Sequence, residues 1–173
     1  MLTIHRPNVD ELYSYYKTYL KYVPEDDILQ AFIKQKDTTR NFLKSISEEK
    51  GSSAYADGKW LLKEVVGHLC DTERILSYRA LRISRNDKTP LPGFDENTYT
   101  PNANFGPRKL ANVSDEFKAV RESSIALFGN MSEEMFSRRG TTNNVDVSVR
   151  DILYFILAHE RHHLGVIKER YLL

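Results

Sequence analysis

Four long segments of the chain repeat apolar residues at intervals of three and four, and this periodicity constrains the fold more than any other feature. Such spacing places the apolar side chains on one face of an α-helix. The segments span roughly residues 24–46, 60–84, 107–129 and 148–171. An alternating strand pattern is almost absent. We therefore predict an all-α fold, a four-helix bundle preceded by a short helix that begins at Asn8 or Asp10.

A long connector, residues 85–106, separates the second segment from the third and contains three prolines and two glycines. Connections between bundle helices usually span about two to eight residues, so this one is long enough to cross the bundle. Its aromatic residues predict that it is ordered and packed. Residues 139–147 are expected to form a loop or a small hairpin. No repeat or linker divides the chain, and we expect a single domain over residues 1–173.

The charge balance and the single cysteine exclude several classes of protein. There are 25 basic and 24 acidic residues, giving a net charge of +1, and no basic stripe that would favour nucleic acid. No apolar run reaches the length of about 18 residues needed to cross a membrane, and no signal peptide is evident. Cys70 alone can form neither an intrachain disulfide nor a cysteine-based zinc site. We expect a cytoplasmic protein without nucleic-acid or membrane partners.

Two histidines occupy the inward face of the last segment, where apolar side chains are expected. The segment opens with Ser148 and Asp151, which resemble a capping box. Its inward stripe then runs through Ile152, Ile156, His159, His163 and Ile167. A buried imidazole needs a polar partner, and histidines four residues apart on one helical face can hold one metal ion.

A third histidine, His68, lies in the second segment in the same kind of apolar setting. Three histidines from two helices would give a metal site with an open coordination position, which is the catalytic rather than the structural zinc pattern. Imidazole also suits nickel, copper and iron. His162 lies one step off the stripe and is the weakest candidate ligand. The alternative interpretation is that each imidazole is hydrogen-bonded to a partner in the core.

Residues 159–163 also fit H-E-x-x-H, the zinc-protease motif, in which Glu160 would be the general base. The surroundings of the motif argue against a protease. A third ligand would have to be Glu169, and the turn that would bring it to the metal requires glycine where this chain has Val166. We expect Glu160 to be a solvated carboxylate rather than a group that reaches a metal-bound water.

Three motifs resemble those of a known family: Gly58–Arg79, Leu91–Asn97 and Ala158–His163. In order and over nearly the whole chain they are similar to the DinB-like family, and to its YfiT group of metal-dependent hydrolases. The resemblance implies a four-helix bundle with a crossover connection and a divalent metal, nickel or zinc, held by three histidines. By motif position these are His68, His159 and His163. It also implies a homodimer and either hydrolysis or transfer of a low-molecular-weight thiol such as bacillithiol.

The expected function is therefore that of a metal-dependent enzyme, a hydrolase or a thiol transferase, acting on a small molecule. The alternative is a non-catalytic, metal-stabilised bundle or a dimeric interaction module in a stress response. The sequence identifies no catalytic base and no substrate.

Several side chains near the motifs have more than one interpretation. Asp71 and Glu73 would either orient an imidazole or pair with an arginine of their own helix. Asp95, in the long connector, is a candidate to overlie the metal, although the sequence gives no distance. Trp60, Phe94 and Cys70 are interpreted as packing residues, the first two in preference to a substrate-binding role.

Overall fold

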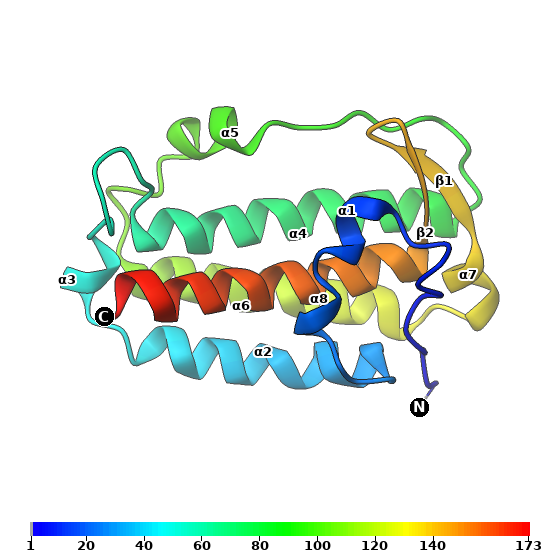
Figure 1. The fold of residues 1–173 in the computed structure, drawn as a ribbon, viewed down its shortest axis with the longest axis horizontal. Coiled ribbons are helices and arrows are strands. Elements are labelled where there is room, and N and C mark those ends of the chain that lie inside the picture. Colours follow the sequence, from blue (N-terminus) through cyan, green and yellow to red (C-terminus); the bar gives the residue numbers. More distant parts are fainter. Residues whose placement is uncertain (1) are drawn as a thin grey trace.

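The computed structural model describes residues 2–173, so Met1 of the predicted domain lies outside it. Four long helices lie side by side as a bundle (Figure 1). They are α2 (Ile28–Lys44), α4 (Leu62–Ser84), α6 (Leu110–Gly129) and α8 (Val149–Val166). Helices α4 and α2 each pack against both α6 and α8. The predicted four-helix bundle is confirmed, and no described helix has the length and apolar character needed to cross a membrane.

Shorter elements close the ends and one side of this bundle. They are α1 (Ser14–Lys17), the 3₁₀-helix η1 (Leu20–Tyr22), α3 (Glu48–Gly51), α5 (Glu96–Asn102), α7 (Glu133–Ser137), β1 (Arg139–Thr142), β2 (Val145–Ser148) and the π-helical turn η2 (Ile167–Tyr171). The strands pair antiparallel, with Arg139 opposite Ser148, so a small hairpin is indeed present. The expected N-terminal helix begins later than Asn8 or Asp10, which instead form a turn.

The connector between α4 and α6 returns along the length of the bundle and carries α5 on its way (Figure 1). Helices α4 and α6 therefore run in the same direction, while α2 and α8 run in the opposite one. Phe105 fixes the end of the connector: its side chain is 4% exposed, and its ring lies over Gly67 of α4. A Cβ at position 67 would stand 2.3 Å from that ring, so only glycine permits this approach.

The starts of the helices follow local capping in some cases and distant contacts in others. Helix α8 begins with the predicted capping box of Ser148 and Asp151. Helix α2 begins after Asp27, whose carboxylate accepts from the Gln30 amide, rather than at Pro24. Helix α6 begins three residues after Pro107, where Glu48 of α3 accepts from two backbone amides.

The buried apolar residues form two clusters, one toward each end of the bundle. Between them lies a polar layer to which each long helix contributes one residue: Thr39, Glu73, Arg121 and Glu160. Cys70 is fully buried in the second cluster, as expected of a packing residue.

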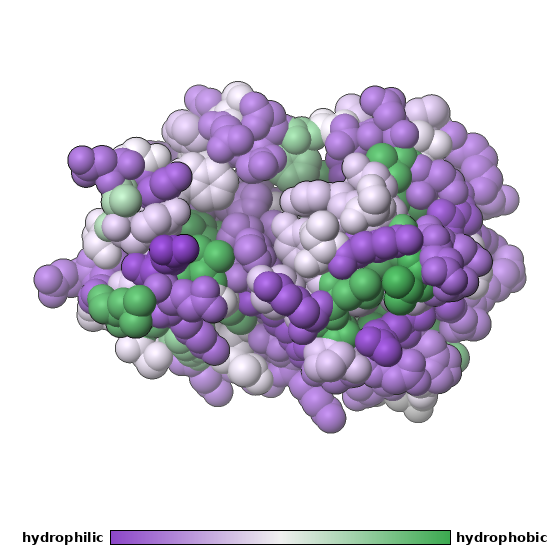
Figure 2. Space-filling view, viewed as in Figure 1, coloured by the Kyte–Doolittle hydropathy of each residue, from purple (hydrophilic) through white to green (hydrophobic). Residues whose placement is uncertain are grey.

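The face of the molecule seen in Figure 2 is mostly hydrophilic, with apolar side chains in separate small areas. This face offers no single broad apolar surface for a partner, and the homodimer stays a prediction.

Candidate metal centre

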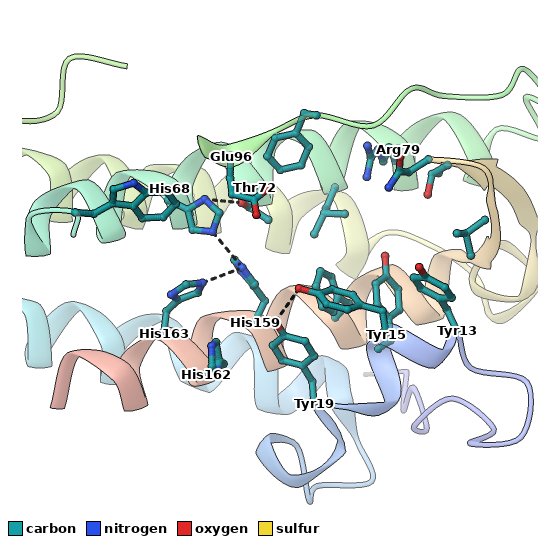
Figure 3. A pocket seen from close by; sticks show the side chains of 18 residues that line it. Tyr13, Tyr15, Tyr19, His68, Thr72, Arg79, Glu96, His159, His162 and His163 are labelled. Atoms are coloured by element: carbon teal, nitrogen blue, oxygen red, sulfur yellow. Dashed lines mark hydrogen bonds between the residues drawn. The ribbon is translucent and has the colours of Figure 1, made fainter. Parts of the chain in front are cut away.

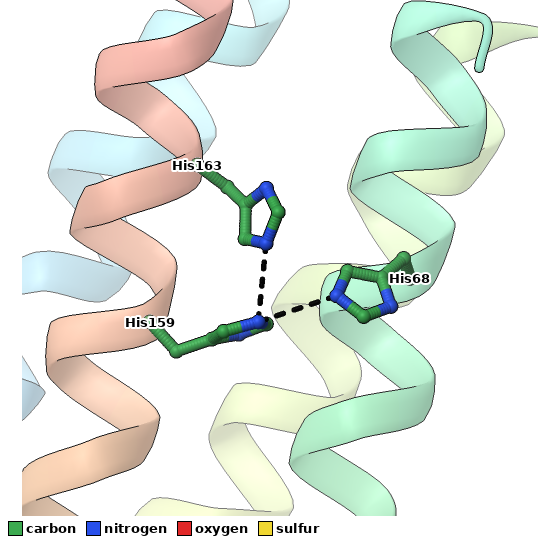
Figure 4. Close-up of side chains that lie close together, drawn as sticks. All are labelled: His68, His159 and His163. Carbon is green, nitrogen blue, oxygen red and sulfur yellow. Dashed lines mark hydrogen bonds between the residues drawn. The ribbon is translucent and has the colours of Figure 1, made fainter. Parts of the chain in front are cut away.

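Three imidazoles converge where the first third of α4 faces the second half of α8 (Figure 4). The Nε2 atom of His159 lies 3.2 Å from Nε2 of His68 and 3.1 Å from Nε2 of His163. One nitrogen from each ring lies within 4.8 Å of the other two. The structure thus brings together all three histidines that the sequence singled out.

Hydrogen bonds between the rings do not account for this arrangement. A neutral imidazole nitrogen carries either one hydrogen or one lone pair, so Nε2 of His159 cannot bond well to two other ring nitrogens at once. A shared cation would satisfy all three. Nitrogens about 2.0–2.1 Å from a metal lie about 3.3 Å apart in tetrahedral geometry and about 3.0 Å apart in octahedral geometry. The distances from Nε2 of His159 to the other two nitrogens, 3.2 and 3.1 Å, fall between these values and favour neither geometry over the other.

Burial keeps these imidazoles in the neutral form that binds metals. His68 and His159 are each only 7% exposed. Desolvation lowers the pKa of His68 to about 4, and desolvation together with the neighbouring imidazoles lowers that of His163 to about 3. The pKa of His159 falls well below its usual value for the same reasons. Near neutral pH, no proton has to be displaced before a metal binds.

Two neighbours of the cluster help to define it. The Thr72 hydroxyl lies 3.4 Å from Nδ1 of His68, one helical turn away, where it can accept the Nδ1 hydrogen and leave Nε2 free. His162 lies outside the cluster, because its Nδ1 atom is 2.9 Å from the hydroxyl of Tyr22. The structure thus separates His162 from the three converging rings.

The expectation that Glu160 is solvated is wrong. Its side chain is buried, one oxygen accepts from Nη2 of Arg121 at 2.6 Å, and the other accepts from the Thr39 hydroxyl. The sequence did not show that α6 places an arginine opposite Glu160. A carboxylate held in this way is not available as the base of an H-E-x-x-H protease.

Neither Asp71 nor Glu73 orients an imidazole. Glu73 accepts from Nε and Nη2 of Arg121 of α6, at 2.9 and 2.8 Å. Its partner is therefore an arginine of another helix, whereas the sequence suggested one of its own. Asp71 lies 3.6 Å from Arg74, the same-helix pairing that was the alternative.

Asp95 does not overlie the cluster but caps α5, accepting from the Asn97 amide at 3.0 Å. The next residue, Glu96, lines the cavity instead. An Asx cap was the sequence signal that would have assigned Asp95 to the start of a helix.

A cavity of about 550 Å³ opens over the histidines (Figure 3). Its walls come from five parts of the chain. They include Tyr13, Tyr15, Tyr16, Tyr19, Trp60, Arg79, Phe94, Glu96, Thr142, Asn143, Val145 and Phe155. Trp60 and Phe94 thus line the cavity rather than only filling the core, and the Trp60 ring lies 5.2 Å from that of His68. The tyrosines of the N-terminal segment were not predicted to take part; their clustering over residues 13–19 was the available signal.

Comparison with known proteins places this geometry in a family. The model of the DinB superfamily matches residues 31–167. A protein of Oceanobacillus iheyensis named "Putative metal-dependent hydrolase OB0413" is 25% identical over 148 residues, covering 81% of this chain and 83% of its own length.

Two solved structures from Bacillus subtilis share the fold. YfiT, described as "a probable metal-dependent hydrolase with an unusual four-helix bundle topology", superposes with a TM-score of 0.69 at 14% identity, covering 96% of this chain and 91% of its own. The DinB-like protein YjoA has a TM-score of 0.57 at 18% identity, covering 84% and 90%.

Proposed function

Since the chain belongs to the DinB superfamily, we propose that it is a metal-dependent enzyme that acts on a small molecule at the three-histidine cluster. The observation that carries this proposal is that Nε2 of His159 lies 3.2 Å from Nε2 of His68 and 3.1 Å from Nε2 of His163, beneath a cavity. The name of the Oceanobacillus relative supports the same class of activity.

His68, His159 and His163 would hold the ion, for which nickel and zinc are the best candidates. When bound, such an ion lowers the pKa of a coordinated water or thiol and so supplies a nucleophile near neutral pH. The cavity is of a size that suits a small molecule. Trp60 and the tyrosines offer rings against which apolar parts of a substrate can pack.

Glu96 is the one carboxylate among the described residues that line the cavity, and it is exposed to solvent. Figure 3 shows Glu96 beside Thr72, at the end of the cavity where His68 lies and the nucleophile would form. We assign it the role of accepting the proton that the nucleophile loses. This position suits hydrolysis and thiol transfer equally, since both require deprotonation of the attacking group.

Metal analysis of the purified protein tests the premise. We expect about one divalent ion per chain after loading, and a large loss in His159→Ala. His162→Ala is the matched control, because it removes an imidazole from the same helix outside the cluster and should keep the ion. Stoichiometry near zero in wild type after metal addition would refute the proposal.

Turnover of the loaded protein then identifies the reaction. A panel of small esters and amides tests hydrolysis, and small electrophiles with cysteine, glutathione or bacillithiol test thiol transfer. Full metal occupancy without turnover in either panel would favour the alternative function, a metal-stabilised bundle without catalysis, since the cluster joins α4 to α8.

A further inference from the structure

The cavity contains a buried cation at the end away from His68 (Figure 3). This is Arg79 of α4, which is only 6% exposed and lines the cavity wall. Its Nη2 donates to the backbone oxygen of Pro92 at 2.6 Å. Among the described residues, no carboxylate lies within the 4.0 Å that defines an ion pair with it. A guanidinium has five N–H donors, and the Pro92 oxygen is the one acceptor for them among the described residues. The guanidinium carbon also lies 5.9 Å from the centroid of the Phe94 ring, an aromatic contact that supplies no counterion.

The other deeply buried arginine shows what this chain does with a cation that only stabilises the fold. Arg121 is fully buried and held by the carboxylates of Glu73 and Glu160. An unpaired buried charge is unfavourable, so burial normally brings a counterion with it. Among the described residues Arg79 has no carboxylate partner, and desolvation lowers its pKa. An anion entering from solution would supply the missing partner.

We propose that Arg79 is an anion-binding subsite of this cavity and takes the carboxylate of an elongated small-molecule substrate. The planar guanidinium matches a carboxylate in a two-pronged hydrogen bond. The reacting end of this substrate would lie at the histidine cluster, and this part of the proposal rests on the proposed function.

Helix geometry sets the length of such a substrate. His68 and Arg79 are 79 − 68 = 11 residues apart on α4. Eleven residues turn the helix by about 1100°, which returns to within about 20° of the same face, and advance it by about 16 Å. Both side chains leave the helix tilted toward its start, and the arginine side chain is the longer of the two, so its guanidinium can lie closer to His68 than the backbone spacing. The two groups of the substrate are therefore on the order of 10–16 Å apart.

The wall between the two ends carries apolar and aromatic side chains alongside polar groups. It includes Leu76 and the ring of Tyr16, which stacks on Phe155 at 4.0 Å with an interplanar angle of 7°. Glu96 lies toward the His68 end, as Figure 3 shows, and its carboxylate repels an anionic group there. The cavity thus favours a molecule with an apolar middle and its negative end directed to Arg79.

Binding of ω-mercapto acids and their neutral carboxamides to the zinc-loaded full chain tests this subsite. Trp60, the single tryptophan, lines the cavity and reports binding by its fluorescence. We expect mercaptoundecanoic acid to bind about 10- to 100-fold more tightly than its amide, as for a hydrogen-bonded charge pair. Mercaptopropionic acid is too short to reach Arg79 and should show no such preference over its amide.

Arg79→Gln should remove the preference for the long acid, and Arg79→Lys should restore part of it. Arg85→Gln is the matched control: it removes an exposed arginine just beyond α4 and should leave the preference intact. Equal binding of the long acid and its amide to wild type would overturn the subsite even if Arg79→Gln failed to fold. A preference that persists in folded Arg79→Gln would overturn it too.

The same measurements separate this inference from the proposed function. If both long probes bind only when zinc and His159 are present, yet bind equally, the metal site stands and the subsite fails. If the metal does not bind but the metal-free protein still prefers the acid in an Arg79-dependent way, the subsite stands and the metal-dependent function fails.

Discussion

The imidazoles of the cluster are buried bases, and their burial makes the stability of the metal-free protein depend on pH. An unfolded histidine has a pKa of about 6.5. In the folded chain the pKa of His68 is lowered to about 4 and that of His163 to about 3. Between these values the unfolded state binds more protons than the folded one. The stabilising effect of neutral imidazoles is therefore complete above the unfolded pKa and is lost as pH falls toward 4.

We expect the free energy of unfolding of the metal-free protein to fall by about 2 kcal/mol per buried imidazole between pH 7 and pH 5. Urea denaturation at the two pH values measures it. The double variant His68→Gln, His163→Gln lacks two of these titrating groups, so its stability should change less over the same interval. Identical pH dependence in the two proteins would contradict the burial argument.

For single residues, the sequence predicted the position of a side chain correctly where that position depends only on the face of its own helix. The positions of His159 and His163 followed from their spacing, and His68 followed from its apolar neighbours. Glu160 was misassigned, because the angle of a side chain on its own helix does not reveal what the facing helix presents. Asp95 and Glu96 illustrate the same limit in a connector, where one residue caps a helix and the next turns into the cavity.

The polar layer binds the long helices to one another. Arg121 of α6 pairs with Glu73 of α4 and Glu160 of α8, and Thr39 of α2 donates to Glu160. The guanidinium also lies over the ring of Phe32, 4.0 Å from its centroid. One charged contact thus sets the relative positions of α4, α6 and α8 between the two apolar clusters.

Arg121→Met should lower the free energy of unfolding by about 3–5 kcal/mol, because two carboxylates would be left buried without a cation. Urea denaturation measures the loss. The triple variant Arg121→Met, Glu73→Leu, Glu160→Leu removes every charge of the layer and should recover a large part of it. If the triple variant is less stable than Arg121→Met, the loss arises from packing rather than from unpaired charge.

The sequence predicted the existence of the long helices better than their ends. Periodicity identified all four, yet α4 begins at Leu62 rather than at Trp60, and α6 begins at Leu110 rather than at Pro107. The start of α6 depends on Glu48, which is 62 residues away from Leu110 in the chain. Capping by a distant side chain leaves no local pattern, whereas the capping box of Ser148 and Asp151 is local and was predicted.

The crossover connection between α4 and α6 helps to form the cavity over the histidine cluster. Because the connector returns along the bundle (Figure 1), it can contribute to the cavity over His68 together with the N-terminal segment and the hairpin. The length of the connector made this path foreseeable. The cavity was not foreseeable, since its walls combine segments that no sequence spacing relates.

A divalent ion at the cluster would join α4 to α8 in the folded state only, so metal removal should destabilise the entire bundle. At a free-metal concentration about 100-fold above the dissociation constant, binding adds about 2.7 kcal/mol. For a chain of this size that corresponds to a melting temperature about 5–11 °C higher than in the metal-free protein. Thermal melts with and without chelator measure the shift. His159→Ala should show little shift in melting temperature, whereas His162→Ala should keep the shift.

Because the ion links two helices of the predicted single domain, the metal-bound and metal-free proteins should each melt in one transition. Two transitions, of which only one moves with metal, would contradict the expectation of a single domain.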